Sequence, residues 1–286
     1  MTGSATAPTG DAELDDLIAR ATAADGVPPF SDGALVAYAN GERELVWERD
    51  AEGNRVAVGL DSKDAAEFVV DPVHRGHGYG SRMLDILTHP SRGGHGTTKL
   101  FWAHGDSAAA KVMMEHHKLE PLREVLHLRA PVPATAKIGD GISTATETDI
   151  DEVLAINARA FANHPEQGRL TREGFDVLRA EPWFSVDNLL VLRERRDGDS
   201  DASMVGFVWL KVVDGDGEFY VVGVDPERQR AGEGRRLMNA GFARLATQSI
   251  QSSHLYVDES NIPALALYTS LGFERVGSDI QYHYAQ

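Results

Sequence analysis

The sequence predicts an α/β protein with a mixed (α+β) sheet, built from two tandem domains of the same fold. Its 286 residues suit about two domains of ~100–200 residues each. In each half, apolar strands come first and then alternate with helices, which is typical of a mixed sheet with helices on both faces. A strand–loop–helix motif occurs twice, with Asp71 and Asp225 at equivalent positions 154 residues apart, which indicates a duplication.

The first half is predicted to begin with a helix and to continue with strands. Residues 11–24 follow a polar start with four apolar residues at helical spacing: Leu14, Leu17, Ile18 and Ala21. Short apolar segments separated by Asn-Gly and Glu-Gly-Asn turns predict strands. These strands are expected at residues 34–40, 44–49, 55–60, 67–70 and 100–103.

The repeated motif is an apolar strand that stops at Asp-Pro, a basic loop with two glycines, and an amphipathic helix. Its second copy has Gly232 and Gly234 where the first has Gly78 and Gly80. Glycine leaves no side chain between backbone and ligand, and a helix N-terminus offers unpaired N–H groups to an anion. Both turns are therefore predicted seats for a pyrophosphate, although glycine also serves tight turns through geometry alone.

A segment rich in proline and glycine, residues 131–141, is predicted to link an N-terminal domain, 1–130, to a C-terminal domain, 142–286. Helices of the second half are expected at 148–161, 171–179, 232–247 and 263–271. Its strands are expected at 142–144, 189–193, 204–213, 218–224 and 254–258, with a last strand pair after Phe273.

Composition narrows the class of protein. The net charge of −16, from 44 acidic and 28 basic residues, argues against binding to nucleic acid backbones. The absence of cysteine excludes disulfides, a cysteine nucleophile and cysteine-based metal sites. No apolar run is long enough to cross a bilayer, and the start lacks the features of a secretion signal. We therefore expect a cytoplasmic protein that binds neither nucleic acid nor membrane. We also expect a monomer, although composition does not bear on this.

The order of elements and two motifs resemble the GNAT superfamily of N-acetyltransferases. One motif is Gln229-x-x-Gly232-x-Gly234, between the fourth strand and third helix of the second half. The other is Asn261-x-x-Ala264-x-x-x-Tyr268-x-x-x-Gly272-Phe273, after the fifth strand. The resemblance is strong in the second half and partial in the first. It implies two tandem GNAT folds that bind acetyl-CoA and transfer its acetyl group to a small-molecule amine.

Within that superfamily, three local strings resemble the mycothiol synthases. They are His-Pro-Glu-Gln-Gly at 164–168, Phe-Trp-Ala-His-Gly at 101–105, and Leu-Tyr-Val-Asp-Glu-Ser-Asn at 255–261. This resemblance implies acetyl transfer to the cysteinyl amine of a cysteine–glucosamine–inositol precursor, the last step of mycothiol biosynthesis.

The same resemblance implies catalytic roles for Glu218 and Tyr268. Glu218 is expected to act as general base, through a water. An α-amine titrates near ~7.7–8, so a modest base suffices. Tyr268 is expected to donate a proton to the coenzyme A thiolate. The alternatives are a surface carboxylate after the Asp-Gly-Asp-Gly turn and a buried aromatic on an amphipathic helix.

Coenzyme A contacts are implied along the fourth strand, the turn and the following helices. In the second half the expected residues are Val222, Gly223, Val224, Gln229, Arg230, Ala231, Gly232, Glu233, Gly234, Arg235, Asn261, Ala264 and Ala266. In the first half they are Phe68, Val69, Val70, Arg75, Gly76, Gly78, Gly80 and Ser81. The arginines are expected to pair with the pyrophosphate charges.

The acceptor is expected to contact Glu166, Lys211 and Tyr256 beside Glu218, with Asp32 adding a carboxylate from the first domain. A sugar and an inositol need several donors and acceptors, which these residue types supply. Lys211 and Tyr256 are otherwise explained as a solvated strand end and a core aromatic.

The first half departs from the motif where chemistry is expected. At the 154-residue offset, Met114 stands for Tyr268, Ser107 for Asn261, Lys118 for Gly272, and Asp64 for Glu218. Methionine cannot give a proton, so the first domain is predicted to bind acetyl-CoA without turning it over, or to serve as a scaffold. His74-x-x-His77 and His116-His117 lack further ligands at a metal-site spacing, so no metal is expected.

Two other functions remain open at this point. One is a GNAT enzyme acting on another amine, such as an aminoglycoside or a protein N-terminus. The other is a non-catalytic acyl-CoA-binding sensor, which the altered first half makes reasonable.

Overall fold

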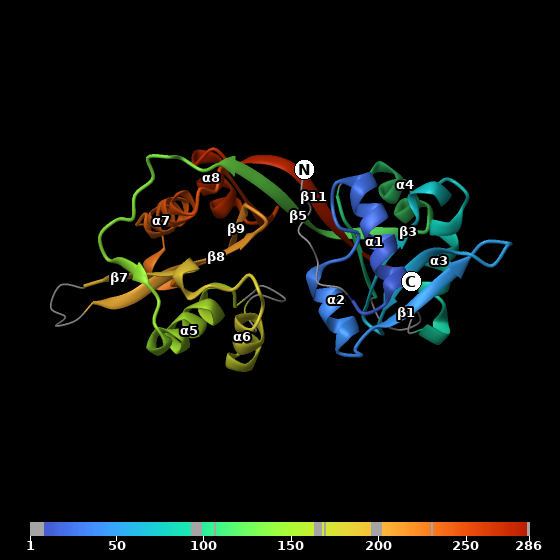
Figure 1. Ribbon diagram of the computed structural model, residues 1–286, viewed down its shortest axis with the longest axis horizontal. Helices are drawn as coiled ribbons and strands as arrows, with labels where there is room; N and C mark the ends of the chain where they lie inside the picture. Colours follow the sequence, from blue (N-terminus) through green and yellow to red (C-terminus); the bar gives the residue numbers. More distant parts are fainter. Residues whose placement is uncertain are drawn as a thin grey trace. The chain divides into compact units, whose positions relative to one another are not determined.

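The computed structural model describes residues 9–92, 99–105, 107–162, 168, 170–195, 202–229 and 231–284. The chain forms two compact units (Figure 1). The first unit comprises Met1–His127, Asp258–Ser260 and Val276–Gln286, and the second comprises Leu128–Val257 and Asn261–Arg275. The last segment of the chain thus packs with the first unit, whereas sequence reasoning grouped residues 142–286 together.

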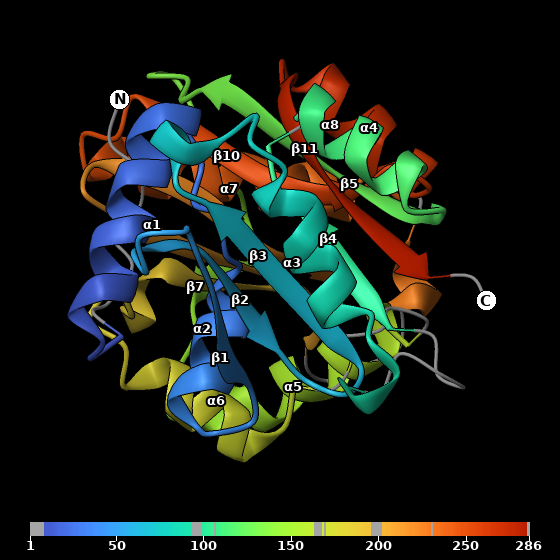
Figure 2. The same ribbon diagram turned by 90° about the vertical axis from the view of Figure 1, so that its right-hand side faces the viewer.

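The first unit is a sheet in the order β1-β2-β3-β4-β11-β5. Its strands are β1 (Glu44–Arg49), β2 (Arg55–Asp61), β3 (Ala65–Val70), β4 (Leu100–Ala103), the end of β11 (Glu274–Tyr284) and the start of β5 (Leu119–Pro131). Its helices are α1 (Ala12–Asp25), α2 (Asp32–Ala39), α3 (Tyr79–Leu87) and α4 (Ala108–His116), with short 3₁₀ turns at Pro72–His74 and Pro90–Arg92. The strands β1, β2 and β3 lie side by side and antiparallel (Figure 2).

The prediction of a strand at 34–40 is wrong, because this segment is the helix α2. The side-chain oxygen of Ser31 accepts a hydrogen bond from the N–H of Ala34 and so caps the helix. The segment Ala-Leu-Val-Ala-Tyr-Ala is apolar throughout, and such a short run suits a strand or a buried helix equally. The cap residue decides between them.

Each face of the first sheet carries its own apolar core. On one face, α1 and α2 pack residues such as Leu14 and Leu35 against Val58 and Val69 of the sheet. On the other face, α3 and α4 pack against β2, β4 and β11. Ile280 and Tyr282 of β11 belong to this second core, and β11 pairs with β4 from Ile280 opposite Ala103 to His283 opposite Leu100. The end of the chain is therefore part of the first unit's interior.

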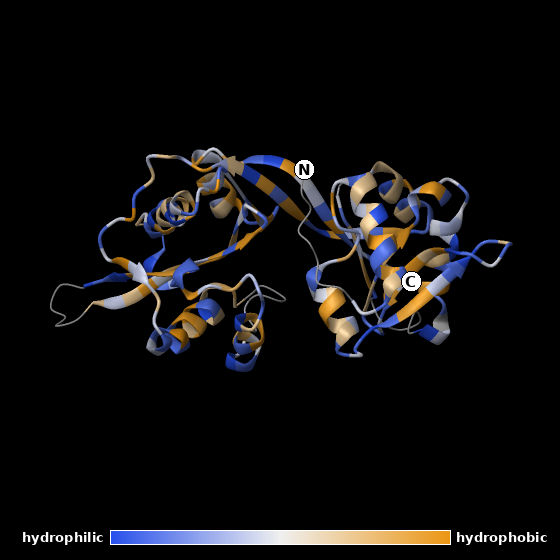
Figure 3. Ribbon diagram, viewed as in Figure 1, coloured by the Kyte–Doolittle hydropathy of each residue, from blue (hydrophilic) through white to orange (hydrophobic). Residues whose placement is uncertain are grey.

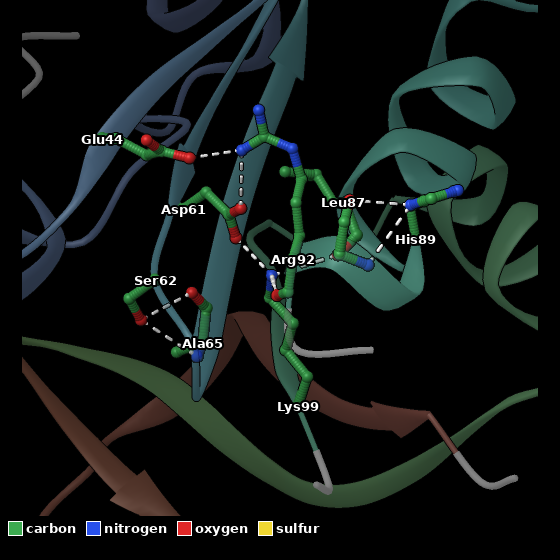
Figure 4. A network of polar contacts seen from close by, with 9 residues as sticks. Glu44, Asp61, Ser62, Ala65, Leu87, His89, Arg92 and Lys99 are labelled. Carbon is green, nitrogen blue, oxygen red and sulfur yellow. Dashed lines mark hydrogen bonds and ion pairs between the residues drawn. The ribbon is translucent and has the colours of Figure 1, made fainter. Parts of the chain in front are cut away.

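A buried ion pair fixes the start of β4 (Figure 4). Lys99 and Asp61 are 1% and 3% exposed, and the Lys99 ammonium also donates to the carbonyl oxygen of Leu87 at 3.0 Å. That carbonyl lies at the end of α3, so the ammonium satisfies one of the helix's last acceptors. Arg92 pairs with Asp61 from the other side, at 3.2 Å, and with Glu44. The pair ties β2, α3 and β4 together.

The second unit is a sheet in the order β5-β10-β9-β8-β7-β6, to which β5 gives its last residues. Its strands are β6 (Ile142–Thr144), β7 (Leu189–Glu194), β8 (Ser203–Val213), β9 (Asp216–Val224) and β10 (Ser252–Asp258). Its helices are α5 (Ile150–Ala160), α6 (Arg172–Arg179), α7 (Glu233–Thr247) and α8 (Ile262–Ser270), with 3₁₀ turns at Glu147–Asp149, Val186–Asn188 and Pro226–Arg228. The strand pair expected after Phe273 is instead the single strand β11.

The second sheet is also covered on both faces. Helices α5 and α6 pack against Trp209 and Val221 on one face. On the other face, Phe242 of α7 contacts Phe219 and Phe273, with ring centroids 5.0 and 5.7 Å away. Hydrophilic and hydrophobic residues alternate around α1, α5 and α6 (Figure 3), as expected for helices that lie on a sheet. These two layers place the end of β9 and the start of α7 at one edge of the unit.

Candidate active site

The strand–turn–helix motif has nearly the same backbone in both units. Asp71 and Asp225 each accept a hydrogen bond from the N–H two residues ahead, at 3.3 and 3.1 Å. The glycines that precede α3 and α7, Gly78 and Gly232, have φ of +82° and +102°, a region that L side chains rarely adopt. A Cβ built on either glycine meets nothing within 4 Å. Open space therefore lies in front of each turn.

Helices α3 and α7 both begin at a glycine N-cap, which supplies no side-chain cap. Their N-terminal N–H groups are thus directed at that open space, and the helix dipole favours an anion there. The residue types and the backbone fit a pyrophosphate at both turns. Arg75 and Gln229 also match, because Arg75 Nε and Gln229 Nε2 each donate to the last carbonyl of the preceding strand, both at 3.2 Å.

The second glycine of each motif lies at a close contact between two helices. A Cβ on Gly234 would lie 3.1 Å from the side chain of Leu267 on α8. A Cβ on Gly80 would lie 2.8 Å from the sulfur of Met113 on α4. In both units the motif helix and the helix after the next strand therefore approach each other through a glycine.

A β-bulge in β9 distinguishes the second unit from the first, whose equivalent strand has none. Trp209 of β8 pairs with Val221, and the next residue, Leu210, pairs with Phe219, so that Tyr220 is the extra residue. In the parallel pairing of β9 with β10, Gly217 lies opposite Ser253 and Glu218 lies opposite His254. The two strands thus pair just before the bulge, and a bulge bends a strand away from its ladder. This leaves the end of β9 available to pair with an extended ligand.

A row of polar side chains crosses the second sheet at this point. Lys211 of β8, Glu218 of β9 and His254 of β10 are register partners and so share one face. The His254 Nε2 lies 3.8 Å from Glu218 Oε2, and its Nδ1 lies 3.4 Å from Asp216 Oδ2. Arg129 donates to both oxygens of Asp216, at 3.2 and 2.8 Å. The predicted base thus lies within a network of charged groups.

The environment shifts the protonation of this network. Burial lowers the pKa of His254, and the charges of Arg129 and Lys211 act in the same direction against the attraction of Asp216. Burial alone would raise the pKa of Asp216, but Arg129 and His254 outweigh it and hold that pKa below its usual value. His254 is therefore favoured as neutral imidazole beside an ionised Asp216.

Sequence reasoning missed His254, Asp216 and Trp183. The ammonium of Lys211 lies 5.4 Å from the Trp183 ring centroid and 6.0 Å from that of Tyr220, both within cation–π range. The spacing of Asp216 and Glu218, two residues apart on a strand, was a usable signal because it places both carboxylates on one face. The pairing of His254 with Glu218 depends on a strand register that the sequence does not state.

Tyr268 lies on α8, partly buried, with its ring 5.8 Å from that of Phe273. Burial raises the pKa of Tyr268 to about 12, so the phenol keeps its proton at physiological pH. Asn261 caps the same helix, since its side-chain oxygen accepts from the N–H of Ala264 at 3.2 Å. Ala264 is half-buried and Ala266 is exposed.

Tyr256 on β10 is 49% exposed, with its ring 6.0 Å from that of His254.

The arginines around the second turn bind protein groups. Arg228 and Arg236 both pair with Glu194, and Arg235 donates to the hydroxyl of Ser270 at 2.5 Å. Glu233 is buried and accepts from the N–H of Ala231 at 3.2 Å. These three arginines are thus engaged with protein groups, and Arg230 lies outside the described residues.

The first unit contains a cavity of about 490 Å³ at its own turn. All eight residues predicted there line it: Phe68, Val69, Val70, Arg75, Gly76, Gly78, Gly80 and Ser81. Asp25 also lines it and engages Arg75 through two hydrogen bonds of 2.6 and 2.8 Å. The cavity also reaches Trp102, Met113 and Met114.

A buried charge cluster borders this cavity and was not foreseen. His104 binds Glu67 through Nε2 and Asp279 of β11 through Nδ1, both at 3.1 Å. Burial disfavours the imidazolium, but Asp279 and Glu67 outweigh that cost and raise the pKa of His104 to about 10. Ser31 donates two further hydrogen bonds to Glu67, at 2.7 and 2.8 Å.

The two units differ at the positions proposed for chemistry. β3 has no bulge, since its register with β2 runs without a shift. The parallel pairing of β3 with β4 sets Ala65 opposite Leu100, just as Glu218 lies opposite His254. The counterpart of Glu218 is therefore Ala65, and the simple 154-residue offset to Asp64 is wrong by the one residue of the bulge. Met114, the counterpart of Tyr268, is buried at 1% exposure.

The remaining predicted residues fall in different places. Glu166 and Arg230 lie outside the described residues. Asp32 is the exposed first residue of α2 in the first unit.

Among described residues, no cluster of three His, Asp or Glu side chains is placed to hold a metal. In the same part of the chain, every helix is too short or too polar to span a membrane.

Comparison with known proteins gives consistent findings. The acetyltransferase (GNAT) family matches residues 156–273. A mycothiol acetyltransferase of Clavibacter sepedonicus is 41% identical over 283 residues, covering 94% of this chain and 90% of that protein. One from Kytococcus sedentarius is 36% identical, covering 96% and 94%. A tandem GNAT protein of the clavulanic acid pathway has a similar fold, with a TM-score of 0.66, 16% identity, and 96% of each chain covered.

Proposed function

Because the chain belongs to the mycothiol acetyltransferases, we propose that it acetylates the cysteinyl amine of a cysteine–glucosamine–inositol precursor. Membership makes the protein an acetyl-CoA-dependent N-acetyltransferase of the GNAT type that acts in mycothiol biosynthesis. The identity of the accepting amine and the roles of individual residues are the proposed part.

The second unit is the proposed catalytic domain. Its turn, from Gln229 to Gly234, is proposed to bind the pyrophosphate of acetyl-CoA through backbone N–H groups, which the open space at Gly232 and the uncapped helix support. The backbone of Val222 to Val224, beyond the bulge, is proposed to pair with the pantetheine arm as an added strand. Ala264 and Ala266 are proposed to face the same arm.

Glu218 is the proposed general base, acting through a water. It accepts a proton from the acceptor nitrogen as that nitrogen forms its bond to the acetyl carbonyl carbon. Tyr268 is the proposed general acid. It donates its phenolic proton to the sulfur as the carbon–sulfur bond breaks, so that neutral coenzyme A leaves. Its raised pKa keeps the proton on the phenol until that moment.

The acceptor is proposed to bind over the polar row of the second sheet. Lys211 and Tyr256 flank Glu218 and His254 there, and their donors and acceptors suit a hydroxyl-rich sugar and inositol. Glu166 and Asp32 are proposed as further contacts. Trp183 offers an aromatic face next to Lys211.

The first unit is proposed to bind acetyl-CoA without transferring its acetyl group. Its cavity and turn fit a phosphate-bearing ligand. Ala65 and Met114 stand where Glu218 and Tyr268 do in the second unit, and neither can accept or donate a proton. Ligand release there requires no chemistry, so the site is expected to exchange acetyl-CoA intact.

The observation that carries this function is the bulge at Tyr220, which ends the β9–β10 pairing directly after Glu218 and His254. The test is acetyl transfer by the purified protein from acetyl-CoA to the cysteinyl precursor, compared with an aminoglycoside and an N-terminal peptide. We expect kcat/KM for the precursor to exceed the others at least about 10³-fold, as buried polar recognition permits. Turnover of the peptide equal to that of the precursor would refute the proposed identity of the acceptor. No turnover of any amine would support the sensor alternative.

A further inference from the structure

We propose that His254 is a positioning residue for the base Glu218 and relays the acceptor's proton away from it, an inference that rests on the proposed role of Glu218. The four groups concerned lie in one row of the second unit, Arg129–Asp216–His254–Glu218. Each comes from a neighbouring strand of one sheet, β5, β9 or β10. The row is therefore built into the sheet.

The order of contacts fixes the orientation of the ring. Arg129 holds Asp216 through two hydrogen bonds and also donates to the hydroxyl of Ser252, at 3.0 Å. Asp216 then faces Nδ1 of His254 at 3.4 Å. A carboxylate opposite Nδ1 favours the tautomer with its proton there, as in other carboxylate–histidine pairs. The lone pair of Nε2 is then directed at Glu218, 3.8 Å away.

The charges around the ring favour an acceptor of protons. The groups that face it are Asp216 and Glu218 on β9, Lys211 on β8, Arg129 on β5 and Tyr256 on its own strand. Burial together with the two cations lowers the pKa of His254. Neutral imidazole is thus present near pH 7, when the amine must lose its proton.

The relay balances without any further reactant. Glu218 takes the proton that leaves the acceptor nitrogen and becomes a carboxylic acid. It passes that proton to Nε2 of neutral His254, which regains an ionised Glu218 for the next turnover. The resulting imidazolium releases its Nδ1 proton toward Asp216, whose side chain is 26% exposed and so reaches water. Loss of that proton makes His254 neutral with its remaining proton on Nε2, and a tautomer shift then returns this proton to Nδ1.

The test compares His254→Gln and His254→Phe with the wild type and with Glu218→Gln, by kcat against pH at saturating substrates. Glutamine places a polar group near the position of Nε2 but does not titrate, and phenylalanine keeps only the ring. We expect both variants to lower kcat at least about tenfold, less than the roughly 10²–10⁴-fold of a direct base. In both, the acidic limb that reports His254 disappears, while KM for acetyl-CoA is unchanged.

A second measurement is the NMR titration of the His254 ring without substrate. The wild type is expected to titrate below the usual ~6.5. Asp216→Asn and Glu218→Gln should each lower that pKa further, because each removes a negative charge that favours imidazolium. An unchanged pKa in Glu218→Gln means that the two groups do not interact, and it overturns the inference.

The two proposals fail separately. If Glu218→Gln keeps wild-type turnover, the proposed base is wrong, whatever His254 does. If Glu218→Gln is inactive but His254→Phe keeps the wild-type kcat and pH profile, only the relay is wrong. A lower melting temperature with an unchanged pH profile shows a purely structural histidine and also overturns the relay.

Discussion

At the scale of single residues, Glu218 and Tyr268 were suggested by the resemblance to known N-acetyltransferases, and the structure surrounds each with a distinct environment. Glu218 lies among charged groups on a sheet face, whereas Tyr268 lies partly buried beside Phe273. The sequence could place both on their elements. It could not show that His254 faces Glu218, because that contact depends on the register of parallel strands far apart in the chain.

We expect Glu218→Gln to lower kcat about 10²–10⁴-fold, because glutamine keeps the shape but cannot accept the amine proton. Tyr268→Phe removes only a hydroxyl and should lower kcat with little change in KM, since its proton is needed as the thiolate leaves. Steady-state kinetics check both. The control is Glu152→Gln, an exposed carboxamide change on α5, which should leave kcat unchanged. Full activity in both active-site variants contradicts the assignment.

Gly232→Ala and Gly234→Ala separate two roles of glycine. Alanine at position 232 must adopt φ near +102°, a cost of about 1–2 kcal/mol, and its methyl enters the space proposed for the pyrophosphate. At position 234 the methyl meets the flexible end of Leu267, and the helix propensity of alanine offsets that contact. We expect the larger loss of stability and the larger rise in KM for acetyl-CoA in Gly232→Ala, measured by thermal unfolding and kinetics.

At the scale of elements, strand order and the repeated turn were predictable because they depend on local patterns. The helix α2 was not, since six apolar residues suit either structure until Ser31 caps them. The bulge at Tyr220 was not visible either, because residues 219–222 are all apolar or aromatic, so that one extra residue leaves no mark in the sequence pattern. It shifted the counterpart of Glu218 from Asp64 to Ala65.

The turn of the first unit predicts a second acetyl-CoA site. Isothermal titration calorimetry of the wild type should give two sites per chain, and Gly78→Glu should leave one, because a carboxylate would occupy the open space and repel phosphate. The matched control is Gly53→Glu, which has φ of +89°, open surroundings and a position in the β1–β2 turn. One site in the wild type refutes the prediction.

The buried ion pair of Lys99 and Asp61 predicts a large loss of folding stability when one partner is removed. Lys99→Met leaves Asp61 charged without its closest cation and should cost about 3–5 kcal/mol of unfolding free energy. Lys99→Met combined with Asp61→Leu should recover most of that loss, since a buried pair and an apolar pair are often similar in stability. Denaturant unfolding measures the free energies of unfolding of the wild type, the double variant and Lys99→Met, which should decrease in that order. A double variant less stable than Lys99→Met contradicts it.

At the scale of the whole molecule, duplication was evident from the sequence, but the unit to which the last strand belongs was not. The strand β11 follows the second half in sequence, and its Ile280 and Tyr282 join the core of the first unit in space. A chain that ends after Arg275 should lose Ile280 and Tyr282 from that core, and Asp279 from His104. We expect rapid proteolysis confined to the first unit and a lower first unfolding transition. Equal protease resistance in the shortened and full chains contradicts this.

The position of β11 also sets the order in which the protein is finished during synthesis. Domains that are contiguous in sequence fold as each leaves the ribosome, N-terminal first. Most of the first unit is translated before the second unit, yet the strand beside β4 and the Asp279 carboxylate are translated after it. The sheet of the N-terminal half therefore lacks the strand next to β4 until β11 has emerged from the ribosome. The first unit can thus be completed only after the second unit has been translated.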